Sequence, residues 1–116
     1  MIIKNLTKSL VLFCALFNGA ELQAQKTIET SFEVSGICGM CEDRIEEALD
    51  VKGVKMAEYD LESHILNIAY NSEKITEDEI HALLNAAGHD TEKSKATEEQ
   101  YNTVHNCCKY RAHGNH

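Results

Sequence analysis

The sequence contains no proline, and its 11 basic residues are outnumbered by 19 acidic ones, which gives a formal net charge of −8. A thioredoxin-like redox site places a cis-proline beside its cysteine pair, so the lack of proline disfavours that class of enzyme. The shortage of basic residues disfavours a nucleic-acid partner, because phosphate binding needs a basic face. With 116 residues, the chain suffices for one small domain with a modest core, which argues against a large enzyme with a deep cleft.

The sequence also lacks an apolar run as long as the roughly 20 residues that a membrane-spanning helix requires. An N-terminal apolar run, residues 10–17, follows Lys4 and Lys8 and precedes the polar stretch LQAQ. This layout is typical of a secretory signal peptide. We therefore predict that residues 1–24 are a signal peptide cleaved near Ala24. The mature protein is then periplasmic, and it is not inserted in a membrane.

Apolar periodicity predicts six elements in the order strand, helix, strand, strand, helix, strand. This βαββαβ order is that of a ferredoxin-like α+β sandwich, in which two helices lie on one face of an antiparallel four-stranded sheet. The predicted domain spans residues 26–94, and residues 95–116 form a C-terminal Cys/His-containing tail. The predicted strands are residues 27–35, 54–61 and 65–70 and a short edge strand at 89–94. The first predicted helix starts at Cys41 and is ended by Gly53. The second runs from Thr76 to Gly88, and Thr76 and Glu79 form its capping box.

Cys38 and Cys41 lie between the first predicted strand and the first predicted helix. Unpaired backbone N–H groups and the positive end of the helix dipole stabilise a thiolate at such a position. Two thiolates at this spacing can bind one soft ion, such as Cu(I), Zn(II), Cd(II) or Hg(II), whereas magnesium and calcium prefer oxygen ligands. Metal binding is favoured, and two alternatives stay open: a redox pair, and a structural disulfide, the default for exported proteins.

Four motifs then carry a family resemblance: VSGICGMC, VKGV, the hairpin VKMAEYDLESHILNIAYNSEKIT, and LLNAAGHD. With these motifs, residues 26–94 resemble a heavy-metal-associated domain, the module of copper chaperones, of the N-terminal tails of metal-exporting ATPases and of small periplasmic mercury-binding proteins. The resemblance implies that Cys38 and Cys41 are the main metal ligands. It also places His89 in a loop that approaches the metal, as a third ligand or a group that tunes the thiolates; the alternative is a solvated loop histidine.

One departure from the family affects the choice of metal. The family usually has a methionine and then a hydroxyl residue before the first cysteine, whereas this chain has Gly36 and Ile37. The packing below the loop must therefore differ from that of typical family members, and the identity of the bound metal does not follow from the family resemblance. Cu(I) is the favoured ion, with Zn(II), Hg(II) and Cd(II) as alternatives. Met40 is expected to be a loop or interface residue rather than a third sulfur donor.

The tail contains His105, Cys107 and Cys108 within four positions. Adjacent cysteines rarely bond to each other, because disulfide geometry is specific. We favour a tail that folds back, so that these residues become additional ligands of the Cys38/Cys41 site. The alternatives are a disulfide within or between chains, and a separate weak site that uses the histidines.

Further expectations concern the rest of the tail and two histidines. Residues 93–100 are read as a linker or as the start of a short helix capped by Thr97 and Gln100. The apolar side chains of Tyr101, Val104 and Tyr110 predict that the tail docks on the sheet. In the domain, His64 and His81 are expected at the surface.

These observations predict a metallochaperone or scavenger that passes its ion by ligand exchange to a metal transporter or efflux component after transient docking. We expect no enzymatic activity, because the sequence offers no nucleophile with a base and an orienting group. The protein is expected to be a monomer or a metal-bridged dimer. The alternative function is that of a periplasmic thiol–disulfide or redox-sensing protein that uses the same cysteines.

Overall fold

A computed structural model describes residues 26–112 of the chain. The predicted signal peptide lies outside the described residues, as does the end of the tail after Ala112. No helix in the described range is long and apolar enough to cross a membrane. The elements are β1 (Thr27–Glu33), α2 (Gly39–Ala48), β2 (Val54–Asp60), β3 (Ile65–Asn71), α3 (Glu77–Ala86), α4 (Glu98–Tyr101) and the 3₁₀ helix η1 (Asn106–Cys108).

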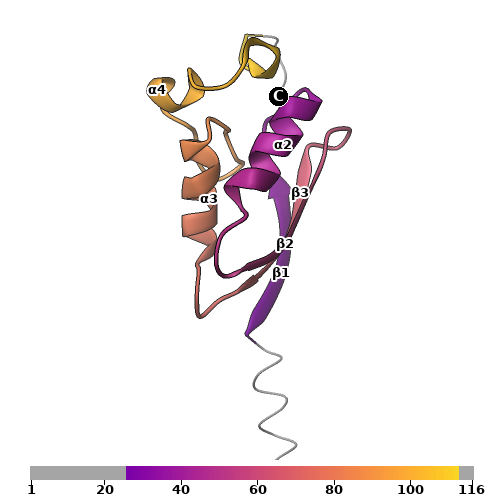
Figure 1. Ribbon diagram of the computed structural model, residues 1–116, viewed down its shortest axis with the longest axis vertical. Coiled ribbons are helices and arrows are strands. Elements are labelled where there is room, and N and C mark those ends of the chain that lie inside the picture. Colours follow the sequence, from indigo (N-terminus) through magenta and orange to yellow (C-terminus); the bar gives the residue numbers. More distant parts are fainter. Residues whose placement is uncertain (1–25, 113–116) are drawn as a thin grey trace, which may run out of the picture.

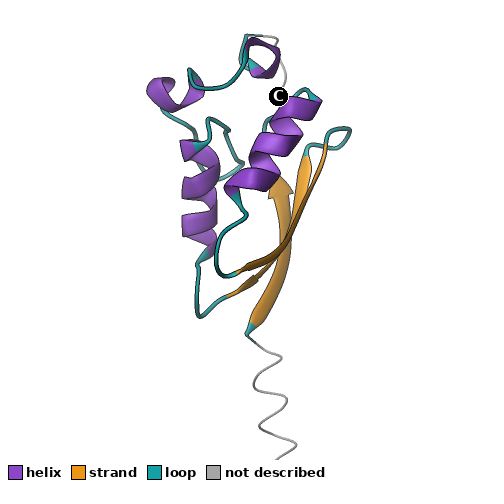
Figure 2. Cartoon of the chain, in the orientation of Figure 1, coloured by secondary structure: helices purple, strands orange, loops and turns teal. Residues whose placement is uncertain are grey.

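The strands form an antiparallel sheet in the order β1-β3-β2, and α2 and α3 lie on one face of it (Figures 1 and 2). Leu66 of the central strand pairs with Phe32 on one side and with Tyr59 on the other. All three side chains are buried, because they point to the face that the helices cover. The main core joins both helices to the sheet, and its buried members are Phe32, Val34, Ile45, Leu49, Tyr59, Leu66, Ile68, Tyr70, Ile75, Ile80 and Leu84.

The fold is the ferredoxin-like α+β fold that the sequence predicts, but the expected four-stranded sheet has only three strands among the residues described. The predicted strand at 89–94 is reduced to a single bridge between Val34 and Thr91. The reason is local: the Thr91 hydroxyl accepts hydrogen bonds from the backbone N–H groups of Lys93 (3.2 Å) and Ser94 (3.1 Å). These bonds turn the chain directly after Thr91, before a second bridge can form.

His81 is a second correction, because this predicted surface residue is buried. Its ring stacks on Phe32 with centroids 4.1 Å apart, and its Nδ1 lies 2.6 Å from the hydroxyl of Thr91. Burial is the main cause that lowers the pKa of His81 below its ordinary value. The histidine therefore belongs to the packing between α3 and the sheet.

Gly88 ends α3 and lets the tail approach it. Its φ of +99° is a conformation that residues with a side chain rarely adopt. A Cβ at this position would lie 2.5 Å from Cγ1 of Val104 and 2.8 Å from the carbonyl oxygen of Gln100. Glycine is thus required both for the helix end and for the close contact with the tail.

The tail folds back over the ends of the two long helices (Figure 1). The predicted cap is confirmed, because Thr97 and Gln100 form a capping box at the start of α4. Helix α4 packs against α3, and η1 packs against α2. The tail aromatics therefore cover the helix ends rather than the sheet, in a second apolar cluster made of Cys41, Tyr101, Val104, Cys108 and Tyr110.

Candidate metal centre

The loop between β1 and α2 positions the first cysteine pair. Cys38 is the N-cap residue of α2 in extended conformation, and its carbonyl oxygen accepts hydrogen bonds from the N–H groups of Cys41 (3.0 Å) and Glu42 (3.2 Å). This cap places Cys41 in the first helical turn, as the sequence predicts. Cys41 is fully buried, whereas Cys38 is partly exposed. One cysteine side chain of the pair therefore reaches solvent, and the other is enclosed in the interior.

The packing below the loop explains why this chain has Gly36 where the family usually has a methionine. The Tyr59 hydroxyl donates a hydrogen bond to the carbonyl oxygen of Val34. A Cβ at Gly36 would lie 3.0 Å from the Tyr59 oxygen and 3.1 Å from Cβ of Cys41. Burial is the main cause that raises the pKa of Tyr59, so this hydroxyl remains a donor. Glycine thus makes room for a tyrosine ring from β2 directly under the cysteine loop.

All four cysteines of the described residues meet at this loop. Cys41 and Cys108 form a disulfide, with their Cα atoms 5.7 Å apart. The Sγ atom of Cys38 lies 3.5 Å from that of Cys41, 3.0 Å from that of Cys108 and 3.2 Å from that of Cys107. The tail therefore folds back onto the loop, and an intrachain disulfide holds it there.

This arrangement has two chemical states. In the disulfide form, the free thiols of the described residues are Cys38 and Cys107. After reduction, Cys41 and Cys108 regain their thiols beside Cys38. The ligand atoms of these three residues all lie within 4.8 Å of one another, which is a donor set suited to one soft ion.

His89 is fully buried, so it is not the solvated loop residue that the sequence left open. Its Nδ1 lies 2.8 Å from the carbonyl oxygen of Ser35, in the segment that leads to the cysteine loop. Its ring stacks on Tyr110 of the tail with centroids 5.8 Å apart. Burial is the main cause that lowers the pKa of His89, and its buried Nε2 has no hydrogen-bond partner in the described part of the chain.

The two predicted histidine ligands lie outside the group of three cysteines that the described residues form. His89 instead connects the cysteine loop to the tail. His105 is exposed, and its carbonyl oxygen accepts a hydrogen bond from the N–H of Cys108 (2.8 Å) as η1 begins. The structure thus brings the sulfur donors together and leaves the imidazoles at the periphery.

Met40 is a neighbour of the cluster that the sequence interpretation set aside. The Cys107 thiol donates a hydrogen bond to Sδ of Met40 at 3.5 Å. The hydrogen bond with Cys38 is the main cause that raises the pKa of Cys107. The contact between Cys107 and Met40 joins residues that are far apart in the sequence, so it could not be predicted from local patterns. The one available signal was the position of a methionine between Cys38 and Cys41.

Aromatic contacts anchor the tail beside the cluster. The Tyr110 hydroxyl donates to the carbonyl oxygen of Gly88 (2.6 Å) and accepts from the N–H of Asp90 (3.0 Å). The rings of Tyr110 and Tyr101 meet edge to face, with centroids 5.1 Å apart. The guanidinium of Arg111 lies over the Tyr101 ring at 4.4 Å. These contacts make the tail a packed part of the molecule.

The fold and the site together define a small ferredoxin-like α+β domain with a cysteine cluster at its first strand-to-helix loop. The chain belongs to the heavy-metal-associated domain family, whose sequence model matches residues 31–90. The match includes the loop with Cys38 and Cys41 and ends before the tail. The cysteine pair at 107 and 108 is therefore an addition outside the family match.

Solved structures support the same assignment. A CopZ metallochaperone is 26% identical, with a TM-score of 0.53 over 55% of this chain and 98% of that chain. A copper-binding domain from HMA7, a P-type ATPase, is 26% identical, with a TM-score of 0.53 over 55% of this chain and 89% of that chain. Oxidized MerP from Ralstonia metallidurans CH34, at 19% identity, shares the fold with a TM-score of 0.53 over 56% of this chain and 93% of its own. No curated protein matches the sequence.

Proposed function

We propose that the protein is an exported soft-metal-binding protein, a metallochaperone or scavenger, that holds a thiophilic ion through Cys38 and Cys41 and passes it on by ligand exchange. The observation that carries the proposal is the gathering of three cysteine ligand atoms, from Cys38, Cys41 and Cys108, within 4.8 Å of one another. Thiolates select soft ions. Cu(I) is the proposed cargo, with Zn(II), Hg(II) and Cd(II) as alternatives.

The exposure of the site supports transfer to a partner. Cys38 is partly exposed at the end of α2, so a thiol from another protein can reach an ion bound there. The structural relatives include a protein described as a metallochaperone and a copper-binding domain of a P-type ATPase. A metal transporter or efflux component that docks transiently is therefore the proposed partner. We expect transfer without catalytic turnover, from a monomer or a metal-bridged dimer.

The proposed compartment is the periplasm. Two observations support it: the signal-peptide layout of residues 1–24 and the disulfide between Cys41 and Cys108. Disulfides persist in oxidising compartments and are rare in the cytosol.

A second candidate function is that of a thiol–disulfide or redox-sensing protein. It is favoured by one contact: the free Sγ of Cys38 lies 3.0 Å from Cys108, which is part of the disulfide. Attack of the Cys38 thiolate on Cys108 forms a Cys38–Cys108 bond and releases the Cys41 thiolate, without any external oxidant. Exchange of this kind needs no metal, which makes the two functions separable by experiment.

An anaerobic titration of the fully reduced protein with Cu(I), with parallel counting of thiols, tests the proposal. All samples carry Cys14→Ser, so that only the four cysteines of the described residues are counted. We expect stoichiometric binding that Cys38→Ser abolishes. His89→Ala should cause a smaller loss, because His89 lies beside the site and not among its sulfurs. Rapid disulfide exchange with no affinity for Cu(I) would support the redox function instead.

A further inference from the structure

The disulfide form of the protein presents a second set of sulfur ligands. The bond between Cys41 and Cys108 removes both residues as thiolate donors. Cys38 and Cys107 remain free, and their Sγ atoms lie 3.2 Å apart although 69 positions separate them in the sequence. Sδ of Met40 lies 3.5 Å from Sγ of Cys107. Two thiols and a thioether, contributed by the loop and by the tail, thus meet at one point.

The donor chemistry of this set is that of a soft-ion site. Thiolate and thioether sulfurs together select Cu(I) and similar ions over hard cations. Two thiolates bound to one ion at about 2.3 Å in the trigonal geometry of three ligands are roughly 4 Å apart. Cys38 and Cys107 therefore need to separate only slightly to accommodate an ion, and the exposed side chain of Cys107 has room to do so.

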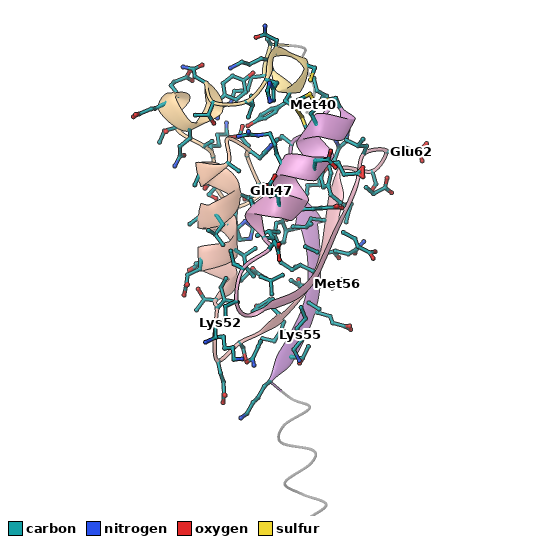
Figure 3. The ribbon with its side chains drawn as sticks, viewed as in Figure 1. Met40, Glu47, Lys52, Lys55, Met56 and Glu62 are labelled. Carbon is teal, nitrogen blue, oxygen red and sulfur yellow. A yellow bond between two sulfur atoms is a disulfide. The ribbon has the colours of Figure 1, made fainter. Side chains whose placement is uncertain are left out.

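The second set also differs from the first in its access to solvent. Cys41 and Cys108 are fully buried, whereas Cys107 is exposed and Met40 is 44% exposed. Figure 3 shows Met40 at the N-terminal end of α2, next to the tail. An ion held here is open to incoming ligands from outside the protein.

We propose that, in the disulfide form, the protein binds a soft cation through Cys38 and Cys107, with Met40 as an additional thioether ligand. The proposal rests on the proposed function only for the class of ion. Cys38 is shared by both states: its partner is Cys41 in the reduced form and Cys107 in the disulfide form. The disulfide form thus holds the ion at a more exposed pair than the reduced form does, and both forms bind metal.

The test uses Ag⁺, a soft, sulfur-seeking ion that does not reduce a disulfide. The full chain with Cys14→Ser is isolated with its disulfide intact, and a thiol count of two per chain verifies this state. Binding of Ag⁺ is measured by competition with a calibrated chelator, and mass spectrometry checks the disulfide afterwards. The same series is repeated on samples that have been reduced with a dithiol and freed of it.

The disulfide form should bind one Ag⁺ per chain. Removal of a residue that hydrogen-bonds to a metal ligand typically lowers metal affinity 10–100-fold. Cys107→Ser removes the ligand itself, so it should lower the affinity for Ag⁺ about 100-fold or more. Met40→Leu should cause a smaller loss. Met56→Leu is the matched control, because Met56 has a similar exposure of 39% but lies on β2, away from the sulfur cluster (Figure 3). Circular dichroism verifies that each variant is folded.

The reduced samples separate this proposal from the proposed function. Reduced Cys107→Ser should keep its affinity, because Cys38 and Cys41 are both available. If Cys107→Ser binds Ag⁺ as tightly as its parent in the disulfide form, the second site is overturned, whereas binding by the reduced form still supports the proposed function. If the disulfide form binds through Cys107 and the reduced form does not bind, the second site stands and the proposed function fails.

Discussion

The guanidinium of Arg111 donates two hydrogen bonds to the carboxylate of Asp90, from Nη2 at 2.7 Å and from Nε at 3.2 Å. Asp90 follows His89 in the loop after α3, and Arg111 lies near the end of the described tail. Both side chains are largely shielded from solvent, with relative exposures of 15% and 27%. The pair therefore fastens the last part of the tail to the domain, three residues beyond Cys108.

Replacement of Arg111 should loosen the tail. In the reduced protein, Arg111→Gln is expected to lower the free energy of unfolding by about 1–2 kcal/mol, because a charge-assisted pair is lost and Asp90 keeps an unbalanced charge. Urea unfolding measures this change, and the rate of alkylation reports on the exposure of Cys108. Lys95→Gln, at an exposed position in the same segment, is the control. Equal unfolding and alkylation in both variants would contradict the anchoring role.

Truncation after Lys95 tests the contribution of the tail to the metal site. The main core contains no tail residue, so the shortened domain should remain folded. Its affinity for Cu(I) under reducing conditions should decrease, because the truncation removes Cys108, the tail cysteine whose ligand atom lies within 4.8 Å of those of Cys38 and Cys41. Competition titrations with Cu(I) and Zn(II) measure the effect, and circular dichroism verifies the fold. An unchanged affinity for both ions would mean that the tail has a docking or disulfide role only.

Two buried histidines predict a loss of stability in acid. Burial lowers the pKa of both His81 and His89 below the ordinary value of 6.5. The unfolded chain therefore takes up protons near pH 6.5, whereas the folded protein resists them until the pH is lower. Their contribution is fully present above pH 6.5 and decreases below it, by up to about 1.4 kcal/mol per pH unit for each histidine.

Urea unfolding at pH 7.5 and pH 5.5 measures this dependence. Replacement of both buried histidines by glutamine should flatten the profile, even if the variant is less stable at every pH. His105→Gln serves as the control, because it also removes a histidine but at an exposed position outside the packed interior. A wild-type stability that does not fall between the two pH values would contradict the prediction.

The fold should not depend on the metal. The strands and helices bury their own apolar faces in the main core, unlike small domains in which a metal provides the folding energy. Far-ultraviolet circular dichroism of the reduced protein should be nearly identical with and without Cu(I). A large gain of secondary structure on addition of the ion would show that the metal organises the domain.

Local patterns made much of this fold predictable. The alternation of Leu66, Ile68 and Tyr70 reports which face of β3 is buried, and the spacing of Thr97 and Gln100 reports a capping box. Each of these features depends on residues a few positions apart. His81 also had a readable signal, because it lies next to Ile80 and three positions before Leu84, on the buried stripe of α3. Polarity alone favours a surface position for a histidine, whereas the place of His81 on the helix favours burial.

The features that the sequence could not provide depend on distant contacts. The partner of Cys108 is decided by the path of the tail over α2, and that path is fixed by contacts to Gly88 and Asp90. The absence of a fourth strand from residues 26–112 is explained by Thr91, whose hydroxyl accepts hydrogen bonds from the N–H groups of Lys93 and Ser94, so that the chain turns away from β1. In both places a specific side-chain contact overrides the pattern of apolar residues.

The disulfide joins Cys41 to Cys108, which are 67 positions apart in the sequence, and closes a loop that contains β2, β3, α3 and α4. A crosslink over such a length restricts the unfolded chain, and the chain-entropy relation gives about 4 kcal/mol at 25 °C for a loop of this size. Oxidation should thus increase the resistance of the domain to unfolding and to proteolysis. The thiol redox state of the surroundings would therefore govern the lifetime of the protein as well as the identity of its free sulfurs.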